Sequence, residues 1–143
     1  EMLKAVSMWS EKADYIFMAA AVSDWRAANP SKTKIKKGKK EFLLKLKENP
    51  DILKVIGKKK NCRLVGFALE TGNLAGNAAR KLKSKNLDII VANKLTKGFK
   101  LFGDNKIDIL IMDRYGGRDL YKSLPKNRLA KIILDKAFCF KIK

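Results

Sequence analysis

Charged side chains that could bind an anion follow the first apolar segment of the chain. Residues Tyr15–Ala20 are apolar, and the triplet Asp24-Trp25-Arg26 comes soon after them. The basic segment Lys34–Lys37 follows a short distance further on. Ligands of open α/β sheets bind beyond the carboxyl ends of the strands. The pattern therefore predicts that a binding site begins at the end of this first strand.

A second set of cations lies on a predicted helix over residues Thr71–Lys85. Lys81 and Lys85 are four residues apart, and Asn77 is one turn earlier on the same face. Two ammonium groups at this spacing repel each other by a few tenths of a kcal/mol in an isolated helix, and a bound anion would reverse that sign. A solvated basic face is the alternative interpretation, and the spacing alone leaves both open.

The overall charge favours anionic partners without naming one. The chain has 33 Lys and Arg against 14 Asp and Glu, which gives a net charge of +19. Such a field attracts nucleotide triphosphates, nucleic acid or anionic lipid, although a lysine surplus is also common in proteins from hot environments. Histidine is absent, which excludes a histidine base, a Ser-His pair and a histidine-ligated zinc. Catalysis must use lysine, carboxylate, amide or a bound metal.

The cysteines and the hydropathy pattern set the cellular context. Cys62 and Cys139 lack metal-ligand spacing and are too few for a disulfide framework, so we expect reduced residues of a cytoplasmic protein. No apolar run approaches the ~20 residues that span a bilayer, and the N-terminus has no signal-peptide pattern. No membrane partner is expected.

The order of the predicted elements favours an α/β fold. Strands are expected at 15–20, 64–68, 87–92, 107–112 and 118–124, and helices at the N-terminus, from Pro50, over 71–85 and from Pro125. Strands that alternate with helices predict right-handed crossovers. We predict a single domain over residues 1–143 with a Rossmann-like, mostly parallel sheet flanked by helices. The last helix should bury one apolar face, made of Leu129, Ile132, Ile133, Ala137 and Phe140.

Several details of this fold are predicted from local signals. Strand 15–20 is apolar throughout, which is typical of a central strand covered on both faces. The segments 33–37 and 42–47 are expected to pair as a β-hairpin flap, and Tyr115-Gly116-Gly117 should turn a second hairpin at the sheet edge. Asn49 is placed to cap a helix with Pro50 at its first position, and that helix start could bind an anion.

Five of these segments together resemble phosphopantothenoylcysteine synthetase. The segments Ala20–Arg26, Lys34–Lys37, Asn49–Ile52, Gly66–Thr71 and Lys81–Asn93 occur in that family in this order and at similar spacing. The resemblance extends from the first helix to the last. In the family, this domain is commonly the C-terminal half of a bifunctional coenzyme A biosynthesis protein, in which a separate decarboxylase domain binds FMN.

The resemblance implies an enzyme that uses CTP, with Mg²⁺ on the phosphates, to join 4′-phosphopantothenate to cysteine. The carboxylate would attack the α-phosphate to give an acyl-cytidylate and pyrophosphate, and the cysteine amine would displace CMP. Lys34 is implied as a catalytic residue on a flap, and a homodimer is implied, with no protein ligand for the metal. The implied nucleotide contacts are Asp24, Lys34, Pro50, Asp51, Ile52, Leu53, Phe67, Lys81 and Lys85. The implied substrate contacts are Ala20, Ala21 and Arg26.

The family pattern also has parts that this sequence does not contain. In the family a strand, a Gly-rich phosphate loop and a catalytic asparagine precede the first helix, so we expect this chain to keep some CTP affinity and little synthetase activity. A basic nucleic-acid-binding domain is an alternative, supported by the charge and by Trp25 beside Arg26. A non-catalytic dimerisation module of the same family is another. The choice between CTP and ATP stays open.

Overall fold

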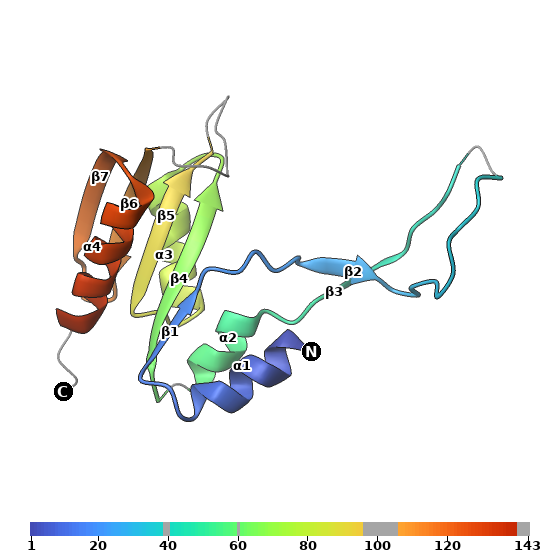
Figure 1. The fold of residues 1–143 in the computed structure, drawn as a ribbon, viewed down its shortest axis with the longest axis horizontal. Helices are drawn as coiled ribbons and strands as arrows, with labels where there is room; N and C mark the ends of the chain where they lie inside the picture. Colours follow the sequence, from blue (N-terminus) through green and yellow to red (C-terminus); the bar gives the residue numbers. More distant parts are fainter. Residues whose placement is uncertain (39–40, 60, 96–105, 140–143) are drawn as a thin grey trace. The chain divides into compact units, whose positions relative to one another are not determined.

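The computed structural model describes residues 1–38, 41–59, 61–95 and 106–139 (Figure 1). The chain divides into two compact units. The first unit contains Glu1–Ala19 and Ile52–Lys143, and the second contains Ala20–Asp51. That residues 1–143 act as one domain stays a prediction.

A five-stranded sheet forms the centre of the first unit. Its order is β1-β4-β5-β6-β7, with β1, β4 and β5 parallel and with β6 and β7 antiparallel to their neighbours. The strands are β1 Tyr15–Met18, β4 Arg63–Glu70, β5 Ile89–Lys94, β6 Ile107–Asp113 and β7 Arg118–Leu124. The predicted α/β, Rossmann-like fold with a hairpin at its edge is confirmed.

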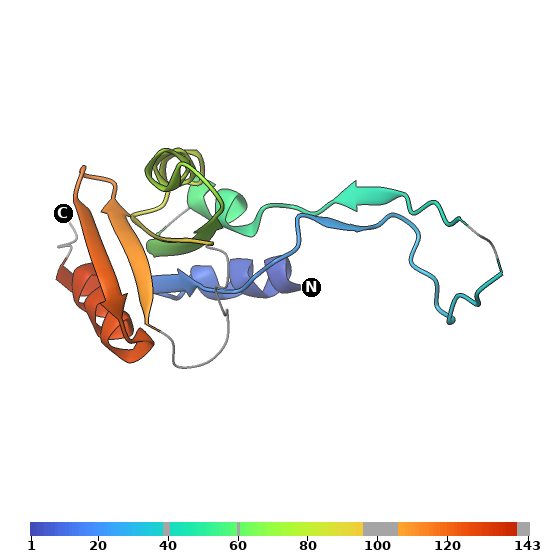
Figure 2. The same ribbon diagram turned by 90° about the horizontal axis from the view of Figure 1, so that it is seen from above.

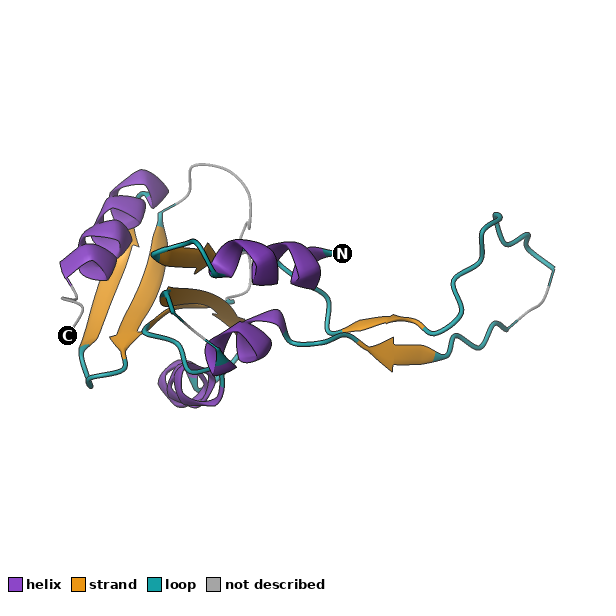
Figure 3. Cartoon of the chain, turned by 90° about the horizontal axis from the view of Figure 1, so that it is seen from below, coloured by secondary structure: helices purple, strands orange, loops and turns teal. Residues whose placement is uncertain are grey.

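Helices cover both faces of this sheet. Helices α1 (Met2–Ser10), α2 (Ile52–Lys58) and α3 (Leu74–Ser84) supply side chains to the core on one face. Helix α4 (Lys126–Cys139) packs on the other face, and Figures 2 and 3 show α3 and α4 on opposite sides of the strands. None of the helices that the structure describes combines the length and apolarity needed to cross a membrane.

The two cores follow from the alternation of side chains along the strands. Successive residues of a strand point to opposite faces, and β4 shows this directly. Leu64 and Ala68 belong to the core under α2 and α3, whereas Val65 belongs to the core under α4. Leu64 and Val65 are both fully buried, because β4 lies between β1 and β5 and is covered on both faces.

The prediction for the first strand is wrong in its length and its position. Strand β1 ends at Met18, and within the described residues it pairs with β4 alone, at the edge of the sheet. Its four residues are half-buried. An apolar run indicates that side chains are buried, but an edge strand can be covered on both faces without a neighbouring strand on each side. The rings of Tyr15 and Phe138 of α4 pack edge to face, with 4.8 Å between their centroids. Ile16 packs against the core on the opposite face.

The predicted turn and the last helix are close to the structure. Gly116 has φ +98° in the turn between β6 and β7, a conformation that favours glycine. The Asp113 carboxylate accepts hydrogen bonds from the N–H groups of Tyr115 and Gly117 at 2.8 and 3.0 Å. On α4, Leu129, Ile133 and Ala137 are buried as predicted, and Ile132 is half-buried. Phe140 lies outside the described residues.

The second unit contains a short hairpin that differs from the predicted one. Strands β2 (Trp25–Ala27) and β3 (Leu46–Glu48) pair antiparallel, with Arg26 opposite Lys47. The predicted first arm, 33–37, is not a strand, and the second arm is a strand only over Leu46–Glu48. Alternation of Lys and Ile predicts a strand only where one face is buried, and Ile35 is 59% exposed.

Candidate functional site

The parallel strands of the first unit bring polar side chains to one edge of the sheet. Strands β4 and β5 run in the same direction and end at Glu70 and Lys94, which are register partners. The N–H of Leu95 donates to the Glu70 carbonyl oxygen at 2.7 Å and fixes the strand end. Ligand sites of open α/β sheets lie at this carboxyl edge, so Glu70 occupies a position where chemistry is expected.

Glu70 is held by two side chains of helix α3. The Lys81 ammonium lies 2.7 Å from Glu70 Oε1, and Asn77 Nδ2 donates to Oε2 at 2.8 Å. Asn77 and Lys81 are four residues apart and share one face of the helix. The sheet edge and the helix therefore meet in a carboxylate–ammonium–amide cluster, defined here as the Glu70 cluster.

The electrostatics of the Glu70 cluster favour the ionised carboxylate. Burial by itself would raise the pKa of Glu70, but the hydrogen bonds from Lys81 and Asn77, with the charges of Lys81 and Arg80, together hold that pKa below its usual value. Glu70 is therefore an anion at neutral pH, although it is only 8% exposed. Lys81 in turn is a cation whose place is fixed by a buried partner.

Lys85, the second predicted phosphate contact, lies one turn beyond Lys81. It is the C-cap residue of α3, and its N–H donates to the Lys81 carbonyl oxygen at 3.1 Å. A cation at this end of a helix is also favoured by the helix dipole. The structure thus brings Lys81 and Lys85 together along one helix, with Lys81 reaching the carboxyl end of β4 and Lys85 preceding β5.

Phe67 lies on the other face of the sheet. It is three residues before Glu70 on β4, and strand alternation sends the two side chains in opposite directions. Phe67 is 39% exposed and lines a groove under α4. The Phe67 side chain and the Lys81 side chain therefore lie on opposite faces of the sheet. The expected contact between Phe67 and a nucleotide remains a separate prediction.

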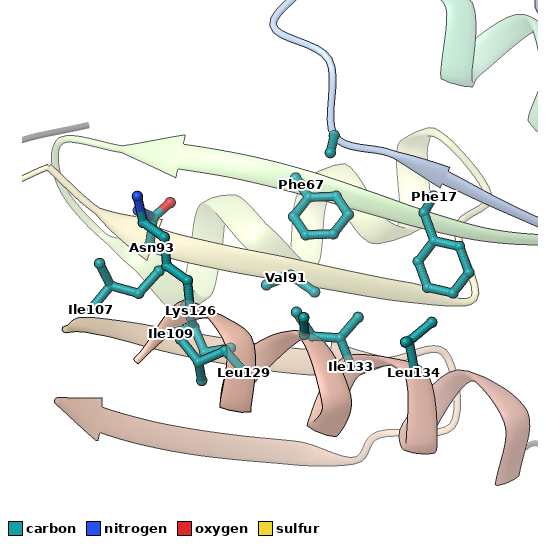
Figure 4. A pocket seen from close by; sticks show the side chains of 12 residues that line it. Phe17, Phe67, Val91, Asn93, Ile107, Ile109, Lys126, Leu129, Ile133 and Leu134 are labelled. Carbon is teal, nitrogen blue, oxygen red and sulfur yellow. The ribbon is translucent and has the colours of Figure 1, made fainter. Parts of the chain in front are cut away.

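The groove beside Phe67 is open and mainly apolar. Its volume is about 650 Å³, and it lies between the sheet and α4 (Figure 4). Asn93 and Ile107 lie toward one end and Phe17 and Leu134 toward the other. Asn93 and Lys126 are the polar side chains that line it.

The predicted site residues of the second unit surround its hairpin. Asp24 is exposed at the start of β2, and its carbonyl oxygen accepts from the Asn49 N–H at 2.7 Å. Arg26 Nη1 donates to the Glu48 carbonyl at 2.9 Å and to Asn49 Oδ1 at 2.6 Å. Ala20 and Ala21 are exposed and precede the hairpin, and Lys34 is exposed in the irregular segment between its strands.

The predicted helix cap at Asn49 is wrong. Helix α2 begins at Ile52, and the Asn49 side chain donates from Nδ2 to the Ser23 carbonyl at 2.8 Å instead. Asn49 therefore joins the two arms of the hairpin, which sequence reasoning missed because its partners lie more than twenty residues away in the chain. Pro50 and Asp51 precede the helix, so Pro50 is not at its first position.

Two of the predicted nucleotide contacts are core residues. Ile52 is 6% exposed, and Leu53 packs against the core under α2 and α3. Their side chains are committed to packing, so the expected contact with a base can come only from their backbone. Asp24 and Lys34 belong to the second unit and Lys81 to the first, and a site that they share stays a prediction.

The described residues contain no group of three or more His, Cys, Asp or Glu side chains arranged to hold a metal ion. Mg²⁺ in phosphate chemistry is usually held by substrate oxygens and water with only one or two carboxylates. The implied Mg²⁺, held mainly by triphosphate oxygens and water, would need no such group among the described residues.

The fold and the Glu70 cluster define the class of protein to which the chain belongs. It is an α/β domain with an ion-paired lysine at the carboxyl end of a parallel strand. Residues 1–139 match the family model described as the DNA/pantothenate metabolism flavoprotein C-terminal domain. The chain belongs to this family.

Relatives of known name support the family. The chain is 39% identical over 138 residues to a cysteine/cysteine sulfinic acid decarboxylase of an unknown prokaryotic organism. It is 38% identical over 138 residues to the coenzyme A biosynthesis bifunctional protein CoaBC of Borreliella burgdorferi. These alignments cover 95% and 94% of this chain but only 38% and 34% of the relatives. The chain thus spans little more than a third of their length.

Solved structures agree with the family. The C-terminal domain of the bifunctional protein CoaBC superposes with a TM-score of 0.73 at 29% identity, over 94% of this chain and 58% of that one. A Cab2 mutant in complex with phosphopantothenate-cysteine shares the fold, with a TM-score of 0.72 at 19% identity over 96% of this chain and 48% of that one. The resemblance to the synthetase domain of the bifunctional coenzyme A biosynthesis protein is confirmed.

Proposed function

We propose that residues 1–143 form part of a phosphopantothenate–cysteine ligase that uses CTP in coenzyme A biosynthesis. The observation that carries the proposal is the fixed ammonium of Lys81 at the carboxyl end of β4, one turn from Lys85, in a chain of this family. Activation of a carboxylate by a triphosphate needs cations that neutralise phosphate oxygens and hold them in line for attack. It does not need histidine, which the sequence lacks.

In this proposal the first unit binds the triphosphate and the second unit contacts the acid substrate. Lys81 and Lys85 of the first unit neutralise the triphosphate as the pantothenate carboxylate forms a bond to the α-phosphorus and pyrophosphate leaves. The nitrogen of cysteine then attacks the acyl carbon, CMP leaves, and the amine proton passes to solvent. Ala20, Ala21 and Arg26 of the second unit contact the acid substrate. Mg²⁺ would add further positive charge at the phosphates when bound.

Lys34 and the nucleotide contacts near it belong to the same proposal. Lys34 is exposed on a segment without regular structure, which suits a side chain that closes over an activated intermediate and excludes water. Asp24 and the backbone at Pro50, Asp51, Ile52 and Leu53 would contact the nucleotide. The side chain of Phe67, if it meets the nucleotide, approaches from the α4 face of the sheet.

We also propose that the protein is a homodimer joined through the second unit. Among the described residues of this unit, seven large apolar side chains are exposed: Val22, Trp25, Ile35, Phe42, Leu43, Leu44 and Leu46. So many exposed large apolar side chains in a short segment favour an interaction surface. A second copy of the unit offers the same side chains and would bury them symmetrically.

The function is tested with the complete protein that contains this chain. Purified protein is incubated with 4′-phosphopantothenate, cysteine and CTP, and pyrophosphate and CMP are measured. We expect pyrophosphate release that requires both CTP and phosphopantothenate, and CMP release that requires cysteine. ATP and GTP are the controls. Absence of product with every triphosphate, together with tight and steeply salt-dependent binding of oligonucleotides, would instead favour a nucleic-acid-binding domain.

A further inference from the structure

The ion pair between Glu70 and Lys81 is unequal in its exposure to water. Glu70 is 8% exposed, whereas the Lys81 side chain is 37% exposed. The carboxylate is therefore part of the interior, and the ammonium lies where the interior meets solvent at the carboxyl edge of the sheet. A ligand arriving from solvent can meet the cation of the pair without displacing the anion.

The carboxylate is fixed from several directions. Glu70 ends strand β4, where its carbonyl oxygen accepts from the Leu95 N–H at 2.7 Å. Its Oε2 accepts from Asn77 Nδ2, which also donates to the Gly72 carbonyl at 3.0 Å. Asn77 Oδ1 accepts in turn from Arg80 Nη2 at 3.2 Å. Each member of this chain of contacts restricts the next, so Glu70 Oε1 presents a rigid acceptor to Lys81.

A rigid acceptor lowers the entropy that a lysine side chain loses when it binds a ligand. A free lysine side chain has many rotamers and loses this freedom when it binds a ligand, and a side chain already held in place avoids that loss. An ammonium has three N–H donors, and the Lys81 ammonium lies 2.7 Å from Glu70 Oε1 as one half of an ion pair. A buried glutamate that orients a lysine toward nucleotide phosphates is an established device in phosphoryl-transfer enzymes.

We propose that Glu70 is a positioning residue that holds the Lys81 ammonium toward a phosphate group of the bound nucleotide. This inference rests on the proposed function and deepens it. Glu70 does not contact the nucleotide and acts only through Lys81. Because the carboxylate charge is offset by the cations Lys81 and Arg80, its repulsion of a phosphate is weak, and the loss of order at Lys81 dominates when Glu70 is removed.

The test introduces Glu70→Gln into the complete protein and asks whether its affinity for CTP rises or falls. The dissociation constant of CTP is measured by calorimetry, and the unfolding midpoint is measured in parallel. The substitution removes one negative charge, so a purely electrostatic role predicts tighter CTP binding. Positioning predicts weaker binding, by about fivefold to tenfold, where tenfold corresponds to ~1.4 kcal/mol. A lower unfolding midpoint with unchanged affinity would show a structural role only and overturn the proposal.

A double-mutant cycle checks that the effect passes through Lys81. In the background of Lys81→Gln, we expect Glu70→Gln to change CTP affinity by less than about twofold, because the group that it positions is gone. An undiminished effect in that background would contradict the proposal. Asn77→Ala, which leaves the charge of the cluster unchanged, should weaken CTP binding by a smaller factor of about two to three.

The outcomes separate this inference from the proposed function. Wild-type protein that neither binds CTP nor forms product with it would refute the proposed function. Wild-type protein that binds CTP and forms product, with a Glu70→Gln variant of equal or higher affinity, would refute only the positioning role of Glu70.

Discussion

The two units of the chain differ in how far their large apolar side chains are buried. In the first unit, Leu64 and Val65 are fully buried between helices and sheet. In the second unit, Leu43 is 99% exposed and Phe42 is 64% exposed, and neither core cluster of the described residues includes any residue of 20–51. The first unit is stabilised by its own packing. The second has a hairpin held by polar contacts, and its large apolar side chains are left exposed.

This difference explains why the candidate chemistry is distributed as it is. The Glu70 cluster rests on a buried strand and a packed helix, so its geometry is fixed before any ligand binds. Lys34 and Asp24 lie on exposed segments outside the helices and strands, so no packed element fixes their side chains in the same way. Rigid scaffolds that carry mobile binding segments are common in enzymes.

The largest expected effect is a loss of core packing in the first unit. Leu64→Ala should lower the free energy of unfolding by about 2–5 kcal/mol, because it leaves a cavity in a fully buried position. Leu43→Ala in the second unit is the matched control and should change it by no more than about 0.5 kcal/mol when measured on the monomer. Equal losses from the two substitutions, by urea denaturation, would contradict the contrast between the units.

A smaller effect is expected where helix α2 meets the end of α3. A Cβ atom built on Gly57 lies 2.1 Å from the Lys85 carbonyl oxygen, and Asn86 Nδ2 donates to the Gly57 carbonyl at 2.7 Å. Gly57→Ala must push this backbone apart and should cost about 1–3 kcal/mol. Gly72→Ala, with nothing within 4 Å of the added atom, is the control and should be nearly neutral in the same thermal unfolding assay.

The pH dependence of stability should reveal the Glu70 cluster. The pKa of Glu70 is lowered in the folded state, so its ion pair stabilises the protein above the unfolded value of 4.5 and the contribution is lost as pH falls through the lowered value. The difference in unfolding free energy between wild type and Glu70→Gln should shrink as pH falls from neutral to below the lowered pKa of Glu70. A difference that stays constant over this range would mean that Glu70 is not held as an anion.

The smallest effect on folding, with a large effect on assembly, is expected in the second unit. Leu43→Ser removes a side chain that is 99% exposed, so the first unit should keep its stability to within about 0.5 kcal/mol. Sedimentation should show a weaker dimer for the variant than for wild type. Wild-type protein that sediments only as a monomer would remove the proposed dimer altogether.

The sheet and the helices of the first unit could be predicted because their residues are governed by local periodicity. The apolar run before Asn93 and the stripe Leu129, Ile133 and Ala137 each fix an element and its buried face. The hairpin arm Trp25–Ala27 could not be predicted, since it is three residues long and exposed. It is held by Arg26 and Asn49, whose partners are distant in sequence.

The parts of the candidate site that rest on local sequence patterns could be predicted, and those that rest on distant contacts could not. The spacing of Lys81 and Lys85 on one helix is a local pattern, and the structure preserves it. Glu70 was not predicted as a site residue, because its pairing with Lys81 depends on how α3 packs against β4. A carboxylate at the end of an apolar strand, followed by a helix with lysines, was the signal that could have indicated it.

The central claim is that Lys81 binds a phosphate of CTP, and one pair of variants tests it most directly. In the complete protein, Lys81→Gln is compared with Lys83→Gln, an exposed lysine of the same helix that has no part in the proposed site. Both lose one positive charge. The KM for CTP should rise about tenfold or more for Lys81→Gln, as expected for loss of a charge-assisted contact, and should stay near wild type for Lys83→Gln. Equal values of KM for the two variants would contradict the claim.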